Sequence, residues 1–455
     1  MAALAPRVLT ARSVRVESWV IVLGCAALVL LVAKLVAGGY APQYVLALAA
    51  LPAFVAVGYR FGFALLAAAV IIRPLIDTAG IPGATSGLAI TVIMLGALCA
   101  VHDVRALILL TLAAGALVAP AMLGREAWGA VAIGEALRLF SVVAVVSITL
   151  VVPGRVTRAG TARIVQLSAT IPAFVALVQA ATGTGTTIGE VERSSGTLSQ
   201  ANPAAFYFTV AAICSLVLVF EGRHPRYDAV ALVAFAGAIV TTGSITGLLT
   251  FVAGIVVYVW LARGLFSKAM ATITTALLIL LTAALLSPVG QGRIAEYTVP
   301  AGPEAEGNSL LWRYAAWDKI LDVWKHHPVT GLGFGATLPG GILATNIAHN
   351  EYIWILAEMG LIGLVVVIGI LTAYLGLLRR FVRRGASRMG WALAVTLLVA
   401  TGLDATADNT LHFTPSLYVL AILLATVWRC ASQECAAVEA ESPPLDVPEV
   451  AVARP

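Results

Sequence analysis

A histidine at the start of a long apolar run is the first candidate for chemistry in this sequence. The run reads TNIAHNEYIWILAEMGLIGL, and we expect Thr345 or Asn346 to cap a helix that begins there. His349 would then lie in the first helical turn, where the positive end of the helix dipole disfavours the charged imidazolium. A neutral histidine accepts a proton near neutral pH, so His349 is a candidate general base. The alternative is a capping or interfacial histidine without a chemical role.

Two charged residues interrupt another apolar run. Glu135 and Arg138 stand three positions apart between residues 130 and 151. An arginine at the centre of a membrane-spanning helix costs about 2.5 to 3.5 kcal/mol to insert, so such residues normally pair or face a cavity. On a helix, residues at this spacing can pair with each other. A self-contained ion pair and a cavity lining both remain open, and in the second case Arg138 is a candidate substrate-binding residue.

The elements that must position these residues are those of a membrane protein. The chain has 455 residues, of which 60% are hydrophobic and 11% are charged, whereas soluble domains have about 25% charged residues. The mean hydropathy is +0.97. This composition excludes a water-soluble enzyme, and we expect no nucleic-acid partner. Apolar stretches that can cross about 30 Å of hydrocarbon predict an all-α, polytopic integral membrane protein with about 12–14 transmembrane helices.

The distribution of charge predicts the orientation of these helices. With the N-terminus inside, alternation of the spans places 19 of the 28 Lys and Arg residues in cytoplasmic segments. We therefore predict a multi-pass protein of the cytoplasmic (inner) membrane with both termini in the cytoplasm. The predicted spans are roughly 19–36, 44–59, 61–76, 88–101, 106–123, 130–151, 164–181, 204–220, 229–242, 246–261, 269–286, 352–378, 391–403 and 413–428.

This pattern divides the chain into four parts. Residues 1–287 hold the N-terminal transmembrane helices and an external loop at 183–203, and residues 288–349 form a second, long external loop. Residues 350–430 hold the C-terminal transmembrane helices, and residues 431–455 read as a disordered cytoplasmic tail. Asp404 and Asp408 fall in an external turn, where we expect them to be solvated; the alternative is that they contact an acceptor sugar. The cysteines and histidines show no metal spacing, so we expect no structural metal and no cofactor.

The long external loop contains a helix of its own. Apolar residues recur at spacings of 4, 3, 4 and 3, which predicts an amphipathic helix that suits the membrane interface. Pro328 ends it, and the glycines in PVTGLGFGA allow a tight loop with close backbone approach. We interpret the segment as a lid, either over a site that opens towards the membrane surface or simply packed on the bundle. The apolar positions are Leu310, Tyr314, Trp317, Leu321 and Trp324.

Several of these motifs together resemble a known family. AHNEYIWILAEMGLIGL at 348–364, preceded by RYAAWDKILDVWKHHPVTGLGFGA at 313–336, resembles the signature region of the O-antigen ligase and polymerase superfamily. In that family a tryptophan-bearing external helix, a Pro-x-x-Gly-x-Gly turn and a His-Asn followed by Glu-x-Gly-x-x-Gly occur in this order. ERSSGTLSQANPAAFYF at 192–208 resembles its Arg-x-x-Gly-x-x-x-x-x-Asn segment, and IIRPLID at 71–77 resembles its early Arg-Pro element. The resemblance covers most of the chain from about residue 60 to 425.

The resemblance implies an activity and several site residues. It implies a metal-independent glycosyltransferase that moves a glycan from an undecaprenyl-diphosphate carrier onto an acceptor hydroxyl, on the external face of the cytoplasmic membrane, in cell-surface polysaccharide biosynthesis. His349 matches the family histidine implicated in catalysis, and Arg193 matches an arginine of the first external loop. Asn202 and Asn350 match the asparagines of the two motifs and are expected to contact substrate. Ile245 stands where the family often has an arginine, so another cation replaces it or the donor is held differently.

Arginines on the external side suit such a donor. A diphosphate leaving group gains negative charge as the sugar bond breaks, and the planar guanidinium answers it with bidentate, charge-assisted bonds. Arg193 is the first candidate, followed by Arg313 in the long loop and by Arg73 at the external end of its span. The alternative for each is an interfacial cation beside lipid headgroups.

The expected partners are an undecaprenyl-diphosphate-linked glycan, an acceptor glycan or glycolipid, and the lipid bilayer. Two other functions remain open. One is a transporter or flippase of lipid-linked substrates, although transporters commonly show repeated halves and no repeat is apparent here. The other is a protein O-oligosaccharyltransferase, which differs only in the acceptor.

Overall fold

The computed structural model of the chain describes residues 61–77, 84–152, 156–188, 191–262, 309–343 and 347–441, with short pieces between 276 and 295. The chain divides into two units, Met1–Gly62 and Phe63–Pro455. All of the elements below belong to the second unit, apart from the first two residues of the first helix. The predicted spans 19–36 and 44–59, and most of 269–286, lie outside the described residues.

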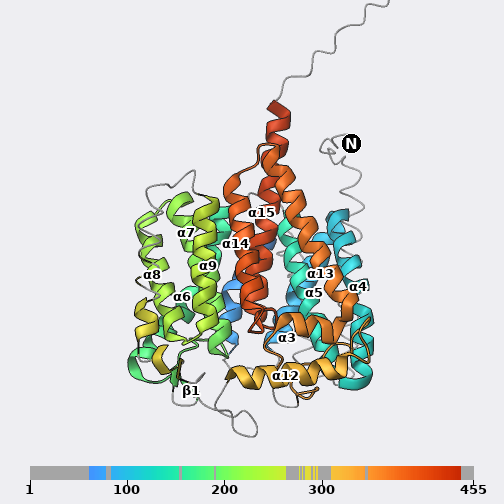
Figure 1. Cartoon of the computed structure of the whole chain (residues 1–455). Coiled ribbons are helices and arrows are strands. Elements are labelled where there is room, and N and C mark those ends of the chain that lie inside the picture. The colour runs from blue at the N-terminus through green and yellow to red at the C-terminus, as the bar shows by residue number, and fades with distance from the viewer. Residues whose placement is uncertain are drawn as a thin grey trace, which may run out of the picture. The chain divides into compact units, whose positions relative to one another are not determined.

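The described elements are almost all helices (Figure 1). Within a bilayer the backbone must satisfy its own hydrogen bonds, which favours helices over open strands. Six described helices (α4, α5, α6, α7, α13 and α15) are long and apolar enough to cross a membrane, and three shorter apolar helices accompany them. The predicted fold class, an all-α polytopic membrane protein, is thereby confirmed. The helices are Phe61–Ile76, α3 (Ala84–His102), α4 (Val104–Trp128), α5 (Ala130–Val151), α6 (Arg158–Thr182), α7 (Ala201–Glu221), α8 (Pro225–Thr241), α9 (Ile245–Leu261), α12 (Ser309–Trp324), α13 (Glu351–Arg383), α14 (Arg388–Asp404) and α15 (Thr414–Glu441).

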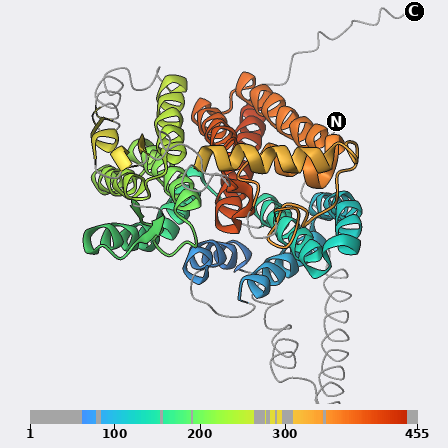
Figure 2. The ribbon, with the colours of Figure 1, turned by 60° about the horizontal axis from the view of Figure 1, so that its bottom comes forward.

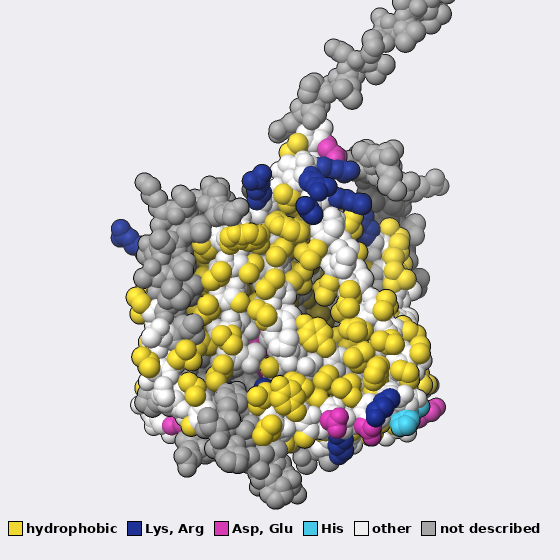
Figure 3. Space-filling view, viewed as in Figure 1, with side chains coloured by type: hydrophobic (Ala, Val, Ile, Leu, Met, Phe, Trp, Pro, Cys, Tyr) yellow, Lys and Arg dark blue, Asp and Glu magenta, His cyan; other side chains and the backbone are white. Residues whose placement is uncertain are grey.

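The helices differ in how much surface they leave for lipid. α7 and α15 are mostly buried among their neighbours, whereas α4 and α13 leave most of their surface exposed. Val365 on α13 is 66% exposed and Leu112 on α4 is 68% exposed. Apolar side chains cover the middle of the surface, and charged side chains gather at its two ends (Figure 3). This distribution is that of a bundle whose apolar belt faces hydrocarbon.

α12 does not run along the bundle. It lies across the ends of the other helices (Figures 1 and 2), and its buried face is centred on Ala316 and Ile320. Part of the predicted apolar stripe is exposed, with Leu310 37% and Tyr314 54% exposed. A helix that packs on protein with one face and leaves aromatic and aliphatic groups at a second face suits the membrane interface.

The C-terminal helix is longer than predicted. α15 continues to Glu441, so the prediction of a disordered tail from residue 431 was wrong for residues 431–441. This stretch is rich in alanine and glutamate, which favour helix. Glu434 also fixes it to the bundle, because one carboxylate oxygen accepts from Arg158 at 2.6 Å and the other from the backbone N–H of Ser387 at 2.8 Å. Residues 442–455 lie outside the described residues.

A short antiparallel hairpin lies in the predicted first external loop. β1 (Thr186–Ile188) pairs with β2 (Val191–Arg193), with Thr186 opposite Arg193. The hairpin and α12 lie at one end of the unit, and the arginine-rich turn between α13 and α14 lies at the other end (Figure 1). This arrangement agrees with the prediction that the two loops and the arginine-rich turn face opposite sides of the membrane.

Candidate functional site

His349 lies immediately before α13 and not in its first turn. Asn350 caps the helix, since its side-chain oxygen accepts a hydrogen bond from the backbone N–H of Ile353 at 3.0 Å. His349 has φ of 48°, in the left-handed region that few non-glycine residues adopt. The expectation that Thr345 or Asn346 caps α13 was wrong, because the asparagine next to the histidine supplies the cap and turns the chain there.

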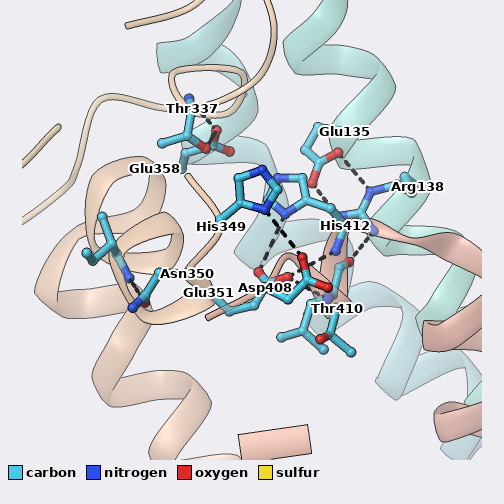
Figure 4. Close-up of polar contacts among 12 residues, drawn as sticks. Glu135, Arg138, Thr337, His349, Asn350, Glu351, Glu358, Asp408, Thr410 and His412 are labelled. Carbon is cyan, nitrogen blue, oxygen red and sulfur yellow. Dashed lines mark hydrogen bonds and ion pairs between the residues drawn. The ribbon is translucent and has the colours of Figure 1, made fainter. Parts of the chain in front are cut away.

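The ring of His349 faces a buried carboxylate. Its Nδ1 lies 3.4 Å from Oδ1 of Asp408, in the loop between α14 and α15 (Figure 4). The histidine side chain keeps 18% exposure, and the Trp312 ring of α12 meets it edge-on with ring centroids 5.8 Å apart. Asp404 and Asp408 were expected to be solvated, but each is only 1% exposed because the loop folds inward between the helices. The arrangement occupies one ring nitrogen and leaves Nε2 to act on another group.

Two further buried charges hold the loop that carries Asp408. Oε1 of Glu351 accepts from the backbone N–H groups of Leu411 at 2.5 Å and His412 at 3.2 Å, and Oε2 lies 3.5 Å from Nδ1 of His412. Burial opposes a charge on the ring, but the neighbouring Glu351 carboxylate, together with Glu135, raises the pKa of His412 above its ordinary value. These bonds tie the loop to the first turn of α13. We call His349, Asp408, Glu351 and His412 the His349 cluster.

Arg138 contacts the same loop from α5. Its Nη1 donates to the carbonyl of Leu411 at 2.5 Å, and its Nε donates to Oε2 of Glu135 at 2.8 Å. The predicted pairing of Glu135 with Arg138 is confirmed. Arg138 also lines a cleft of about 260 Å³, so the ion pair is not self-contained, and binding of substrate by Arg138 stays a prediction. One loop therefore joins Arg138 to the His349 cluster (Figure 4).

This cleft, which we call the arginine cleft, brings together two of the predicted site arginines. Arg73 lines it from the helix Phe61–Ile76, and Arg138 lines it from α5. Nη1 of Arg73 donates to Asp77 at 2.9 Å, and its Nε is buried without a hydrogen-bond partner. Arg73 is paired with Asp77 and Arg138 with Glu135, so an anion attached to an apolar chain would bind to the remaining N–H groups of the two guanidiniums, beside the hydroxyl groups and the apolar wall of the cleft. The remaining lining residues are Thr85, Ser86, Ala89, Ile90, Gly134, Leu137 and Thr414.

The predicted glycine turn, 328–335, docks between α4 and α13 by close backbone approach. The N–H of Leu332 donates to Ala357 at 2.7 Å, and the N–H of Gly333 donates to Glu358 at 3.1 Å. α13 is kinked where they meet, at Gly360 with φ of 65°. On the other side, a Cβ added to Gly333 would lie 2.1 Å from the backbone nitrogen of Gly124. The expectation of a tight, glycine-dependent loop is confirmed.

The turn also positions a buried acid. Oε1 of Glu358 accepts from the backbone N–H of Thr337 at 3.0 Å and from its hydroxyl at 2.9 Å. Glu358 is the glutamate of the Glu-x-Gly motif, and Gly360 is its glycine. The motif therefore joins the kink of α13 to the loop that follows the glycine turn.

Arg193 and Asn202 lie together, held by α7, α8 and the hairpin. Nη2 of Arg193 donates to the side-chain oxygen of Asn202, and Nε donates to the carbonyl of Thr242 at 2.8 Å. The N–H of Ser194 donates to Thr241 at 3.1 Å. Arg193 is buried and rests on the turn that leads to Ile245, the position where the resemblance leads us to expect an arginine. Whether it replaces that arginine or the donor is held differently stays open.

The two remaining predicted residues lie beside the His349 cluster. Arg313 is half-buried on α12, close enough to Asp404 for an electrostatic interaction between the two side chains. Nδ2 of Asn350 donates to the carbonyl of Thr406 at 2.9 Å, while its oxygen caps α13. Both parts of its amide thus make hydrogen bonds within the protein, and the expected contact of Asn350 with substrate stays a prediction. Its role in the structure is to fix the α14–α15 loop to the start of α13.

Sequence reasoning missed Asp408, Glu351 and His412 as parts of the site. Asp404 and Asp408 are four positions apart in the only acidic stretch between the last two spans, which was a signal, but their burial follows from tertiary packing. Glu351 directly follows the His-Asn motif. Among the residues that the structure describes, no three His, Cys, Asp or Glu side chains are grouped so as to hold a metal ion.

Comparison with known proteins places part of this site, including His349 and Arg313, within a family domain. Residues 230–368 match the model of a family described as O-antigen ligase. The matched range begins in α8, ends in α13, and includes Ile245, α12, the glycine turn and His349. Over this range, which is less than half of the chain, the match confirms the resemblance to the O-antigen ligase and polymerase superfamily. None of the curated proteins compared with the chain matches it.

Proposed function

We propose that this membrane protein, which carries an O-antigen ligase domain, transfers a glycan from an undecaprenyl-diphosphate carrier to an acceptor hydroxyl. One observation carries the proposal: a single loop connects the His349–Asp408 pair to Arg138 and the arginine cleft. A base and an anion site that contact the same loop are what a transfer reaction with a diphosphate leaving group requires.

In this proposal His349 acts as the general base. With Nδ1–H donated to Asp408, Nε2 accepts the proton of the acceptor hydroxyl. The hydroxyl oxygen forms a bond to the anomeric carbon of the donor glycan as the bond from that carbon to the diphosphate oxygen breaks. The bonding electrons leave with the lipid diphosphate, and the proton stays on His349. Asp408 stabilises the resulting imidazolium and holds the ring in the required tautomer.

The arginine cleft receives the donor diphosphate. Arg73 and Arg138 face it from two helices, and the hydroxyl groups of the cleft add donors for the remaining phosphate oxygens. The apolar surface around the cleft is exposed, with Ile72 47%, Ile90 48% and Leu137 42% exposed. A polyprenyl chain would lie along this surface in the hydrocarbon while its diphosphate enters from the side.

The other predicted residues take supporting roles. Arg313, on α12 above the His349 cluster, is placed to contact the acceptor or the glycan. Arg193 and Asn202 stabilise the turn before Ile245. Arg193 also places a positive charge near Ile245, the position where the family often has an arginine. The active site then faces the external side of the cytoplasmic membrane, with the arginine-rich α13–α14 turn inside as the positive-inside rule requires.

The test is a transfer assay with purified protein, a synthetic polyprenyl-diphosphate oligosaccharide and a hydroxyl-bearing acceptor glycan. We expect acceptor-dependent product that His349→Ala abolishes and that the exposed control Asp318→Asn on α12 leaves unchanged. Movement of the donor across liposome membranes without a new glycosidic bond would contradict the proposal and indicate a flippase. If secreted proteins carried glycan that is lost when the gene is deleted, the acceptor would be a protein and not a glycan.

A further inference from the structure

A second cleft with two arginines lies at the end of the bundle opposite α12. It has a volume of about 120 Å³ and is formed by the start of α4, the end of α5 and the middle of α15. Arg105 and Arg429 line it, together with Asp103, Trp428 and two serines. It is independent of the transfer chemistry proposed above, and we call it the headgroup cleft. The serines are Ser147 and Ser432, and the remaining lining residues are Ala106, Leu109, Leu150 and Val151.

The polar groups of the headgroup cleft are arranged to receive a ligand. Arg429 is buried to 9% exposure, and its Nη1 donates to the carbonyl of Thr149 at 2.9 Å, which fixes the guanidinium at the cleft. Arg105 is exposed at the first turn of α4. The hydroxyl of Ser147 is buried without a hydrogen-bond partner. A buried polar group of this kind normally finds a partner, so an acceptor oxygen in the cleft would satisfy it.

The surroundings indicate that the ligand is a lipid. Trp428 stacks on Tyr374 with centroids 5.8 Å apart and meets Phe381 edge-on at 5.2 Å, an aromatic group typical of the headgroup level. Next to the cleft, Leu107 and Ile108 of α4 are each 53% exposed, which provides an apolar surface for acyl chains. The cleft therefore opens to the headgroup region of one leaflet.

The charge of the cleft selects among lipids. Oδ1 of Asp103 accepts from the backbone N–H of Arg105 at 2.7 Å as the cap of α4, so two cations and one anion face the cleft. A net charge of plus one suits a phosphodiester with one negative charge. A hydroxyl on the headgroup can also donate to Asp103, whereas a free phosphate dianion would be repelled by it.

We propose that the headgroup cleft binds an anionic phospholipid with a hydroxyl-bearing headgroup, of the phosphatidylglycerol class, with its phosphodiester between Arg105 and Arg429. Such a lipid braces α4 against α5 and α15. α5 carries Arg138, and α15 begins at Thr414 in the arginine cleft, so the bound lipid stabilises the scaffold of both ends of the bundle.

The test measures lipid binding and thermal unfolding of the delipidated full-length protein in detergent. Phosphatidylglycerol should raise the unfolding temperature, whereas phosphatidylethanolamine and inorganic phosphate should not. Arg105→Gln should weaken phosphatidylglycerol binding about fivefold, and adding Arg429→Gln should remove the protection. Arg105 is exposed, so the single variant keeps the proposal testable if the double variant does not fold.

The matched control is Arg380→Gln with Arg383→Gln, two exposed arginines at the same end of the bundle that do not line the cleft. This control should bind phosphatidylglycerol as the wild type does. Equal loss in the control would show general attraction to a basic surface and overturn the site. If inorganic phosphate raised the unfolding temperature equally, the cleft would be a site for soluble anions and the lipid proposal would be overturned. If phosphatidylethanolamine raised it equally, the cleft would not select anionic lipids, which would also overturn the proposal.

Discussion

Replacing Asp408 with asparagine tests how His349 is held. The substitution keeps the shape of the side chain and removes a charge that lies 3.4 Å from Nδ1 of His349. Two unit charges at this distance attract by about 5 kcal/mol in an effective dielectric of about 20. His349 is 18% exposed, and with solvent screening we expect about 2.7 kcal/mol of this to be realised. The imidazolium that forms during transfer loses this stabilisation, so kcat should fall about 100-fold.

The assay is the initial rate of glycan transfer with the donor concentration varied. The KM for the donor should stay within about twofold, because Asp408 acts on the charge that develops in the transition state and not on donor binding. Asp318→Asn removes an exposed carboxylate on α12 and should leave kcat unchanged. Wild-type kcat in Asp408→Asn would refute the reasoning. A loss of kcat that only tracks a lower unfolding temperature would show that Asp408 holds the loop without assisting the base.

Three further perturbations separate the other parts of the account. Arg73→Gln should raise the donor KM about tenfold with little change in kcat, because it removes a charge-assisted bond to the diphosphate; an unchanged KM would contradict this. Gly333→Ala should lower the free energy of unfolding by about 2 kcal/mol or more, because the added Cβ clashes with α4. The control Gly340→Ala has a similar φ of 93° with open space around it, and should lower the free energy of unfolding by less. Equal losses would show that backbone strain alone, and not the contact with α4, causes the effect. Because its pKa is raised in the folded protein, protonated His412 stabilises the fold most below about pH 6.5, and this contribution should fade as the pH rises through the folded pKa. The measurement is the unfolding temperature at a series of pH values, and His412→Gln should make that temperature less dependent on pH.

Much of the fold follows directly from the sequence. Apolar runs of sufficient length must be helical in a bilayer, and the predicted span 130–151 coincides with α5. The amphipathic helix at α12 was also predictable from its spacing, but its buried face was not. Ala316 and Ile320 are both buried, and Ile320 packs against Ala348, which precedes α13, and against Ala357 within it. Small residues such as alanine contribute little to a periodicity read from large apolar side chains. The end of α15 was missed because its contact with Arg158 depends on another helix.

The candidate site was only partly predictable. His349 and Arg138 stand out because they are polar groups at or within apolar runs, and both lie beside the α14–α15 loop. Asp408 is 59 positions from His349 along the chain, and local patterning contains no information about such a pairing. The cap of α13 was misplaced because three capping residues, Thr345, Asn346 and Asn350, precede the same helix. Asn350 is the residue that caps the helix, and it is held there by a tertiary hydrogen bond to the carbonyl of Thr406 in the α14–α15 loop.

The central claim is that His349 serves as the base in glycan transfer from a lipid diphosphate. It is tested most directly by a single-turnover reaction that measures lipid diphosphate released and glycosidic bond formed in the same sample. We expect one lipid diphosphate for each bond formed by the wild-type protein, and neither product from His349→Ala that still binds the donor. Equal formation of both products by His349→Ala, or donor movement without release of diphosphate, would contradict the claim.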